Sequence, residues 1–326
     1  MSNISSVVKN LPWEPATICL YGQTHCGKTT QWVYLAEYLY EKTGLKTRVY
    51  LTDDGDIAQA EEGIKAGVIE KIDIRLAPHP FLTAEKLGSG QVPIFAGYDE
   101  KLDIPTGAWK PVDNSKIGMF VIDSGTSLAD DMFQDLSNKA ALGVNVGGEG
   151  AMNFVDGSAS WGTKTVGSSN RAHYGVVQTR MQVMIGKLAQ LMAREKAMVL
   201  VTFTEDRGET ESMKTTVVGP KVMGSASTPK VPQWFKFTYH LSKAGTTANK
   251  EIAPTLWTTE HTEPGGGQTK CLANRRFPLL APGDNSLTEK FNTKYDPADI
   301  VKALNDHREA SMLVGEAKKK RYGTKS

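Results

Sequence analysis

The sequence has few cysteines, and they are scattered. Cys19, Cys26 and Cys271 are an odd number of thiols with no CxxC spacing, which disfavours both a disulfide framework and a zinc site. The six histidines are equally scattered, so a histidine-based metal site has little support. This cysteine usage fits a reducing compartment best.

Long apolar runs and a strong net charge are also missing. Residues 1–9 lack the apolar core of a signal peptide, and no later run approaches the length needed to span a bilayer. We therefore expect a cytoplasmic protein without a membrane partner. The net charge of +2 is too small to indicate nucleic-acid binding by itself, because that depends on where cations cluster. With 40% hydrophobic and 23% charged residues, the 326-residue chain is an ordinary globular protein with one large core, or one core plus a small appendage.

The most informative stretch is Gly22-x-x-x-x-Gly27-Lys28-Thr29, a complete P-loop (Walker A) pattern. An apolar, β-branched run at 17–21 precedes it, and a helical pattern without Gly or Pro follows at 30–42. Glycines let the backbone wrap a phosphate chain, and the helix presents its positive end to the anion. Lys28 would reach the β- and γ-phosphates, and Thr29 would be a Mg²⁺ ligand. The alternative is a glycine turn before an ordinary helix. The predicted nucleotide-binding residues are Gly22, Gln23, Thr24, His25, Cys26, Gly27, Lys28, Thr29 and Thr30.

An acidic cluster follows the next predicted strand, 47–52. Asp54 is the candidate for the carboxylate that orients or activates the attacking water, with Asp53 and Asp56 as competitors. The carboxyl ends of neighbouring parallel strands meet where open α/β sheets bind ligands, which favours this role. Equally, the cluster would cap a helix that begins near Ile57.

Two further apolar runs end in polar residues. The run 117–123 is typical of a Walker B strand, and its last residue, Asp123, would hold the Mg²⁺ shell near Thr29. The run 197–203 is followed by Thr204 and Glu205, which are candidates for sensing the γ-phosphate. A solvated loop start explains Thr204 and Glu205 equally well.

A late basic cluster contains Lys270, Arg275 and Arg276. Either arginine would stabilise a transferring phosphoryl group if it reached the nucleotide of a neighbouring subunit. The alternative is a strand edge protected by charge.

The remaining pattern predicts one large domain with attached segments. We expect an N-terminal extension at 1–14, the main domain at 15–282, and a C-terminal helix and basic tail at 283–326. Within the main domain, five prolines predict an irregular insertion at 77–115, and Gly- and Ser-rich composition predicts flexible loops at 143–170 and 207–227. Other expected elements are helices at 57–66, 128–142, 172–195 and 297–314, strands at 72–76, 234–241 and 253–259, and a solvated basic tail at 318–325. The methionines of the 172–195 helix are expected to be core residues.

The order of these motifs resembles phage-encoded RecA-like ATPases. It is most similar to the AAA-domain group that includes the Sak-four single-strand-annealing recombinases. The resemblance covers roughly 15–282 and includes the P-loop, Asp53-Asp54-Gly55, Val121-Ile-Asp-Ser124 and the helix start at 170–178. It implies a RecA-like α/β core: a mainly parallel central sheet, helices on both faces, and C-terminal β-hairpins.

The resemblance also implies a function. It predicts an ATPase that uses ATP and Mg²⁺, forms a homo-oligomeric ring or filament, and binds single-stranded DNA through the loops 143–170 and 207–227. The expected use is annealing or recombination in the host bacterial cytoplasm, with a single-strand-binding protein as a candidate partner. Two departures stand out: Thr204-Glu205 replaces a Gln or His, and residue 54 is Asp rather than Glu. The alternatives are a phage assembly or loader ATPase acting on a protein, and a nucleotide-dependent structural protein.

Overall fold

The computed structural model describes residues 9–53, 57–75, 80–99, 104–141, 171–209, 216–223, 228–242, 254–262, 269–274 and 286–322. Its centre is a row of six parallel strands in the order β9-β1-β7-β6-β2-β3. The predicted mixed α/β fold with a largely parallel central sheet is therefore confirmed. The bounds of these strands are β1 Thr17–Gly22, β2 Lys46–Leu51, β3 Ile69–Asp73, β6 Ile117–Asp123, β7 Met198–Glu209 and β9 Phe237–Ser242.

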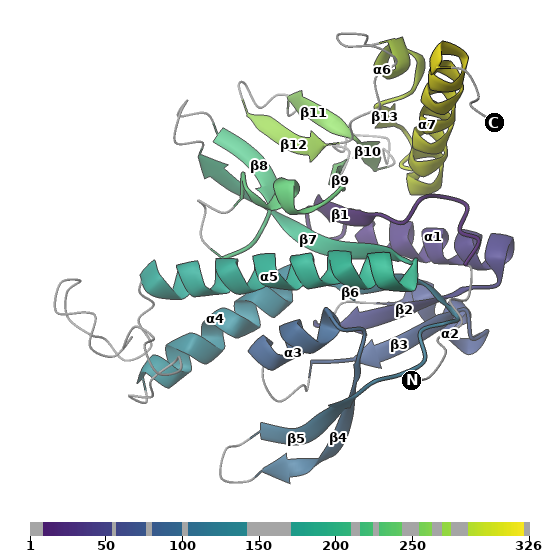
Figure 1. The fold of residues 1–326 in the computed structure, drawn as a ribbon. Helices are drawn as coiled ribbons and strands as arrows, with labels where there is room; N and C mark the ends of the chain where they lie inside the picture. The colour runs from purple at the N-terminus through teal and green to yellow at the C-terminus, as the bar shows by residue number, and fades with distance from the viewer. Residues whose placement is uncertain are drawn as a thin grey trace, which may run out of the picture.

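Helices cover both faces of this row (Figure 1). The helices α1 (Lys28–Thr43), α2 (Glu61–Lys65) and α7 (Ile300–Tyr322) lie on one face, with the short turn η1 (Ala58–Ala60) beside α1. The helices α3 (Pro80–Leu87), α4 (Gly125–Ala141) and α5 (Arg171–Glu195) cover the other face. Both faces of the central strands are thus buried, which explains why their sequences are continuous apolar runs.

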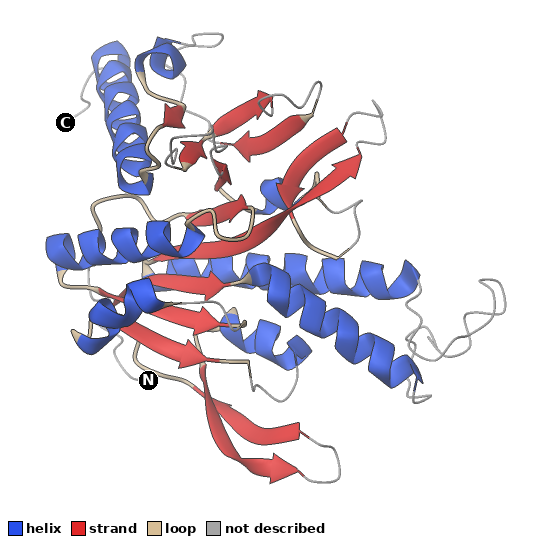
Figure 2. Ribbon diagram, turned by 180° about the vertical axis from the view of Figure 1, so that it is seen from behind, coloured by secondary structure: helices blue, strands red, loops and turns tan. Residues whose placement is uncertain are grey.

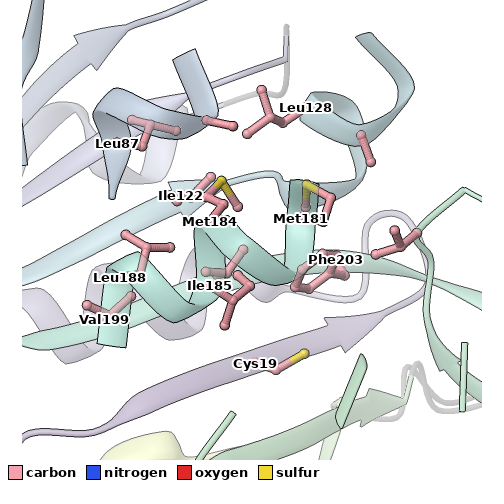
Figure 3. Packing of buried hydrophobic residues seen from close by; sticks show 14 of the residues in the cluster. Cys19, Leu87, Ile122, Leu128, Met181, Met184, Ile185, Leu188, Val199 and Phe203 are labelled. Carbon is pink, nitrogen blue, oxygen red and sulfur yellow. The ribbon is translucent and has the colours of Figure 1, made fainter. Parts of the chain in front are cut away.

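Alternate residues of β1 point into two separate cores. Ile18 and Leu20 pack on the α1 side, whereas Cys19 and Tyr21 pack on the α5 side. Figure 3 shows the second core, where side chains of α5 meet those of the strands. Met181 and Met184 are buried in it, so the expectation that the α5 methionines are core residues is confirmed.

Shorter strands extend the sheet beyond β9 and along the far end of β7. They are β8 (Thr216–Pro220), β10 (Thr255–Trp257), β11 (Thr259–Thr262), β12 (Lys270–Asn274) and β13 (Lys294–Tyr295). The strands β11 and β12 pair antiparallel, and so do β9 and β10. A 3-10 turn, η3 (Val231–Trp234), precedes β9 because Pro232 favours a helical start, so the strand predicted at 234–241 begins later than expected.

The prediction of a flexible loop at 207–227 was wrong for much of its length. The strand β7 continues to Glu209 and pairs antiparallel with β8, where Val217 and Val218 are buried. The glycines and polar residues around these two valines predicted a loop, so the buried strand was not expected from the sequence. Residues 210–215 and 224–227 lie outside the described part.

The prediction of an irregular insertion at 77–115 was also wrong. This segment contains the helix α3. It also contains a hairpin of β4 (Val92–Asp99) and β5 (Ile104–Lys110), which projects away from the main sheet (Figures 1 and 2). Pro80 occupies the first helical position, where its missing N–H has no partner to lose. In a two-stranded hairpin both strands are edges, so Pro93 and Pro105 are tolerated.

Two other boundaries differ from the predictions. The strand expected at 72–76 forms earlier, as β3 at Ile69–Asp73, where it pairs with β2. The C-terminal helix α7 (Ile300–Tyr322) continues beyond the expected end at 314 and includes the first part of the basic tail. The helix α6 (Ser286–Lys290) precedes it. None of the described helices has the length and apolar character needed to cross a bilayer.

Candidate functional site

The P-loop joins the end of β1 to the start of α1, and its glycines have steric reasons to be there. A Cβ atom on Gly22 would lie 2.2 Å from the carbonyl oxygen of Leu241 on the neighbouring strand. Gly27 has a φ of 96°, in the left-handed region that side chains disfavour. The loop therefore needs glycine at both ends to enter the helix at this angle.

The N-terminus of α1 is electropositive. It carries no acidic residue in its first turn, and Lys28 stands at its first position. The Nζ atom of Lys28 donates hydrogen bonds to the backbone oxygens of Gly22 and Gln23, at 3.1 and 2.7 Å. The positive end of the helix and this ammonium group thus act on the same small space, which suits an anion such as phosphate.

Asp123, at the end of β6, lies beside the first turn of α1. Its Oδ2 atom accepts hydrogen bonds from Thr29 Oγ1 at 3.3 Å and from the indole N–H of Trp32 at 2.8 Å. Its Oδ1 atom accepts one from the hydroxyl of Thr202 on β7. Burial raises the pKa of Asp123, and the Thr202 and Trp32 donors oppose that rise because they stabilise the ionised form. The site therefore combines a threonine hydroxyl with a buried carboxylate, a donor set that suits Mg²⁺.

Asp53 follows β2 and reaches the same region. Its Oδ2 atom accepts hydrogen bonds from the hydroxyls of Ser124 and Ser127, at 3.1 and 3.0 Å. The turn η1 follows in the chain, and its N-cap residue, Ile57, makes no side-chain capping hydrogen bond. Asp54 and Asp56 lie outside the described residues.

These groups share one cavity of about 400 Å³. It lies at the carboxyl ends of parallel strands, where α/β sheets bind their ligands. Of the predicted nucleotide-binding residues, Gly22, Gln23 and Cys26 do not line it, and Cys26 is buried. The lining residues are Thr24, His25, Gly27, Lys28, Thr29, Thr30, Asp53, Ile57, Gln59, Asp123, Ser124 and Thr204.

The two sensor candidates have different surroundings. Thr204 lines the cavity, and its N–H donates to Thr126 Oγ1 at 3.0 Å. The strand β7 lies between β1 and β6, and Thr204 is level with Gly22 at the end of β1, which places it at the nucleotide cavity. Glu205 does not line the cavity; its carboxylate contacts His240 Nε2 at 3.2 Å and accepts a hydrogen bond from Gln23.

Several candidates cannot be placed. Arg275 and Arg276, and the loop 143–170, lie outside the described residues. Lys270, from the same basic cluster, is exposed on β12.

The residues that hold Asp123 and Asp53 were not predicted from the sequence. Thr202 interrupts the apolar run of β7, and a polar group inside a buried strand needs a partner. Trp32 is fully buried on α1, and a buried indole N–H needs one as well. These signals show that a partner exists, but they do not show which one. Ser127 and Gln59 gave no such signal.

Comparison with known proteins adds little to this geometry. No protein-family model matches the chain, and no curated protein matches it. Among solved structures it is similar to the RadB recombinase, with 13% sequence identity, a TM-score of 0.42, and coverage of 75% of this chain and 81% of that one. A score this low does not establish a common fold, so the functional argument rests on the site.

Proposed function

We propose that this protein is a Mg²⁺-dependent ATPase with a RecA-like core that couples ATP to single-stranded DNA binding, for annealing or recombination. The observation that carries the nucleotide part is the convergence of Lys28, Thr29 and Asp123 in one cavity. A glycine turn before an ordinary helix does not require a buried carboxylate beside that helix's first turn. Phage origin and membership of the Sak-four type are part of the proposal.

The residues divide the work in a simple way. Backbone N–H groups of the loop and the start of α1 would hold the phosphates, and Lys28 would neutralise charge on the outer ones. Thr29 and Asp123 would hold Mg²⁺, which supplies charge stabilisation at the phosphoryl group when bound. Thr204 would face the terminal phosphate, because it lines the same cavity and is level with Gly22 at the end of β1.

The attacking water needs a carboxylate. Asp54 remains the proposed base. Asp53 is the competitor with a described position, where its Oδ2 atom accepts hydrogen bonds from two serine hydroxyls. Comparing Asp54→Asn with Asp53→Asn separates them: the base variant loses turnover while it keeps affinity for Mg·ATP.

The active assembly would be a homo-oligomer with nucleotide at the subunit boundary. Arg275 and Arg276 directly follow β12 in the chain, and we propose that one of them reaches the neighbouring subunit's nucleotide. A contact of this kind acts mainly in the transition state. Arg275→Ala or Arg276→Ala should therefore abolish turnover with little loss of nucleotide affinity. Loss of affinity in both variants would count against a finger.

The DNA-binding segments would be 143–170 and the turn between β7 and β8. The open ends of α4 and α5 lie on the same side of the molecule as the β7–β8 tip in both ribbon views (Figures 1 and 2). Two segments that start from the same side of the domain are able to contact the same DNA strand. They carry few cations, Lys164 and Lys214 against three acidic residues, so we expect few phosphate contacts and a weak affinity.

The experiment is steady-state phosphate release by the wild type and Lys28→Ala, with and without single-stranded DNA, at about 50 and about 200 mM salt. We expect DNA to stimulate the wild type, more strongly at low salt, and Lys28→Ala to be inactive throughout. Deleting part of 143–170 should remove the stimulation and leave basal hydrolysis. Hydrolysis that is indifferent to DNA at both salt concentrations would replace the DNA proposal with an ATPase directed at a protein partner. Tight ATP binding without turnover would indicate a nucleotide-dependent structural protein.

A further inference from the structure

Three residues from separate parts of the sequence come together beyond the nucleotide cavity. They are His240 on β9, His261 on β11 and Cys271 on β12, and their possible ligand atoms all lie within 4.8 Å of one another. The pairing of β11 with β12 places His261 directly opposite Cys271. The scattered spacing of these residues disfavoured a metal site, but the sheet brings them together.

Aromatic rings hold the two imidazoles in place. His240 stacks on Tyr21 with ring centroids 4.7 Å apart, and His261 stacks on Trp257 at 4.0 Å. His240 Nδ1 and His261 Nε2 face each other at 3.1 Å. His240 and Cys271 are 4% and 1% exposed, so the cluster is largely shielded from water.

The second ring nitrogen of His240 contacts a carboxylate, as the second nitrogen of a metal-binding histidine often does. Its Nε2 atom lies 3.2 Å from the Glu205 carboxylate, so Nδ1 is left to face His261 and Cys271. A carboxylate on the second nitrogen fixes the tautomer and ring orientation of a metal-binding imidazole. The Glu205 carboxylate is thus directed at His240, on the side away from His261.

The distances suit a small tetrahedral ion. With metal–nitrogen bonds of about 2.05 Å and a metal–sulfur bond of about 2.3 Å, two nitrogens lie about 3.3 Å apart and nitrogen and sulfur about 3.6 Å apart. The observed nitrogen separation is already 3.1 Å. The ligand atoms of the cluster lie up to 4.8 Å apart, so side-chain movements of about 1 Å would bring them to the separations of a tetrahedral site.

The donor atoms select the kind of metal. Two imidazole nitrogens and a thiolate suit Zn²⁺ and its relatives, whereas Mg²⁺ and Ca²⁺ require oxygen ligands. We propose that His240, His261 and Cys271 bind a zinc-class transition metal ion, with Glu205 as the positioning residue for His240. This ion would be separate from the Mg²⁺ of the nucleotide site, and it would tie the β11–β12 pair to β9.

The test uses Co²⁺ and Zn²⁺ on the full chain after treatment with a chelator. Co²⁺ bound to a thiolate gives a sulfur-to-metal charge-transfer band, so the spectrum reports Cys271 directly. We expect one ion per chain in the wild type, loss of the band in Cys271→Ser, and at least a tenfold loss of affinity in His261→Gln. Glu205→Gln should weaken binding by about 10-fold to 100-fold and keep the band.

Matched controls are Cys19→Ala and Cys26→Ala, which remove the other two buried thiols. Both should keep the stoichiometry and the spectrum. Failure of the wild type to bind either ion at micromolar concentration would overturn the proposal, and the two histidines would then be a hydrogen-bonded pair in the core. A charge-transfer band that survives in Cys271→Ser would overturn it too. The wild-type spectrum decides the matter even if a variant fails to fold, and it does not depend on nucleotide binding.

Discussion

The hydroxyl of Thr202 should stabilise the protein because it donates to a buried carboxylate. Thr202 is fully buried on β7, and its hydroxyl donates to Asp123 Oδ1. Thr202→Val keeps the shape of the side chain but leaves that oxygen without this donor. A hydrogen bond to a charged group contributes about 1.5–3 kcal/mol, so at about 2 °C per kcal/mol we expect the Tm to fall by about 3–6 °C.

Thr238→Val is the matched control. Thr238 is also fully buried, on the parallel strand β9, but its hydroxyl donates to the neutral carbonyl of Pro232 at 3.3 Å. A long, neutral bond contributes about 0.5 kcal/mol, which corresponds to about 1 °C. The assay is thermal unfolding followed by circular dichroism, without nucleotide, at neutral pH. Equal shifts in the two variants would refute the idea that the Asp123 carboxylate makes Thr202 special.

Two other predictions concern the P-loop backbone and a carboxyl group with a raised pKa. Gly22→Ala should abolish Mg·ATP binding and lower the Tm, because the added Cβ would overlap the Leu241 carbonyl. The control, Gly186→Ala, has open space around it on α5 and should raise the stability by up to about 1 kcal/mol. Equal Tm values for the two variants would contradict this prediction. Burial and neighbouring carboxylates raise the pKa of Asp131 to about 6. The folded state therefore binds this proton more tightly than the unfolded state does, and the stability of the protein falls as the pH rises from about 4 to about 6. Because Asp131 is only partly withdrawn from water, solvent screening limits the gain in Asp131→Asn to about 1–2 °C at pH 7.5. The gain should vanish near pH 4, and the same gain at both pH values would contradict this explanation.

The parts of the site that were predictable are contiguous in the sequence. The P-loop and the apolar run ending at Asp123 each carry their own pattern, because the local backbone must adopt one conformation to bind phosphate or to cross the sheet. Their meeting was expected from the parallel sheet. The structure adds the atoms that hold Asp123, which come from α1 and β7.

The parts that could not be predicted depend on long-range pairing. His240, His261 and Cys271 meet only because β9, β11 and β12 share a sheet, and no spacing rule encodes that. The hairpin β4–β5 was missed for a different reason. Its prolines indicate a loop when each is considered alone, but they are permitted on strands that have an open edge.

The most direct test of the central claim is equilibrium binding of ATP by calorimetry, with and without Mg²⁺. Lys28→Ala removes the ammonium at the start of α1, and Lys42→Ala removes an exposed one in the last turn of the same helix. We predict Mg²⁺-dependent binding in the wild type, an unchanged affinity in Lys42→Ala, and at least a tenfold weaker affinity in Lys28→Ala. Equal affinity in all three proteins, or no binding by the wild type, would contradict a nucleotide site at this loop.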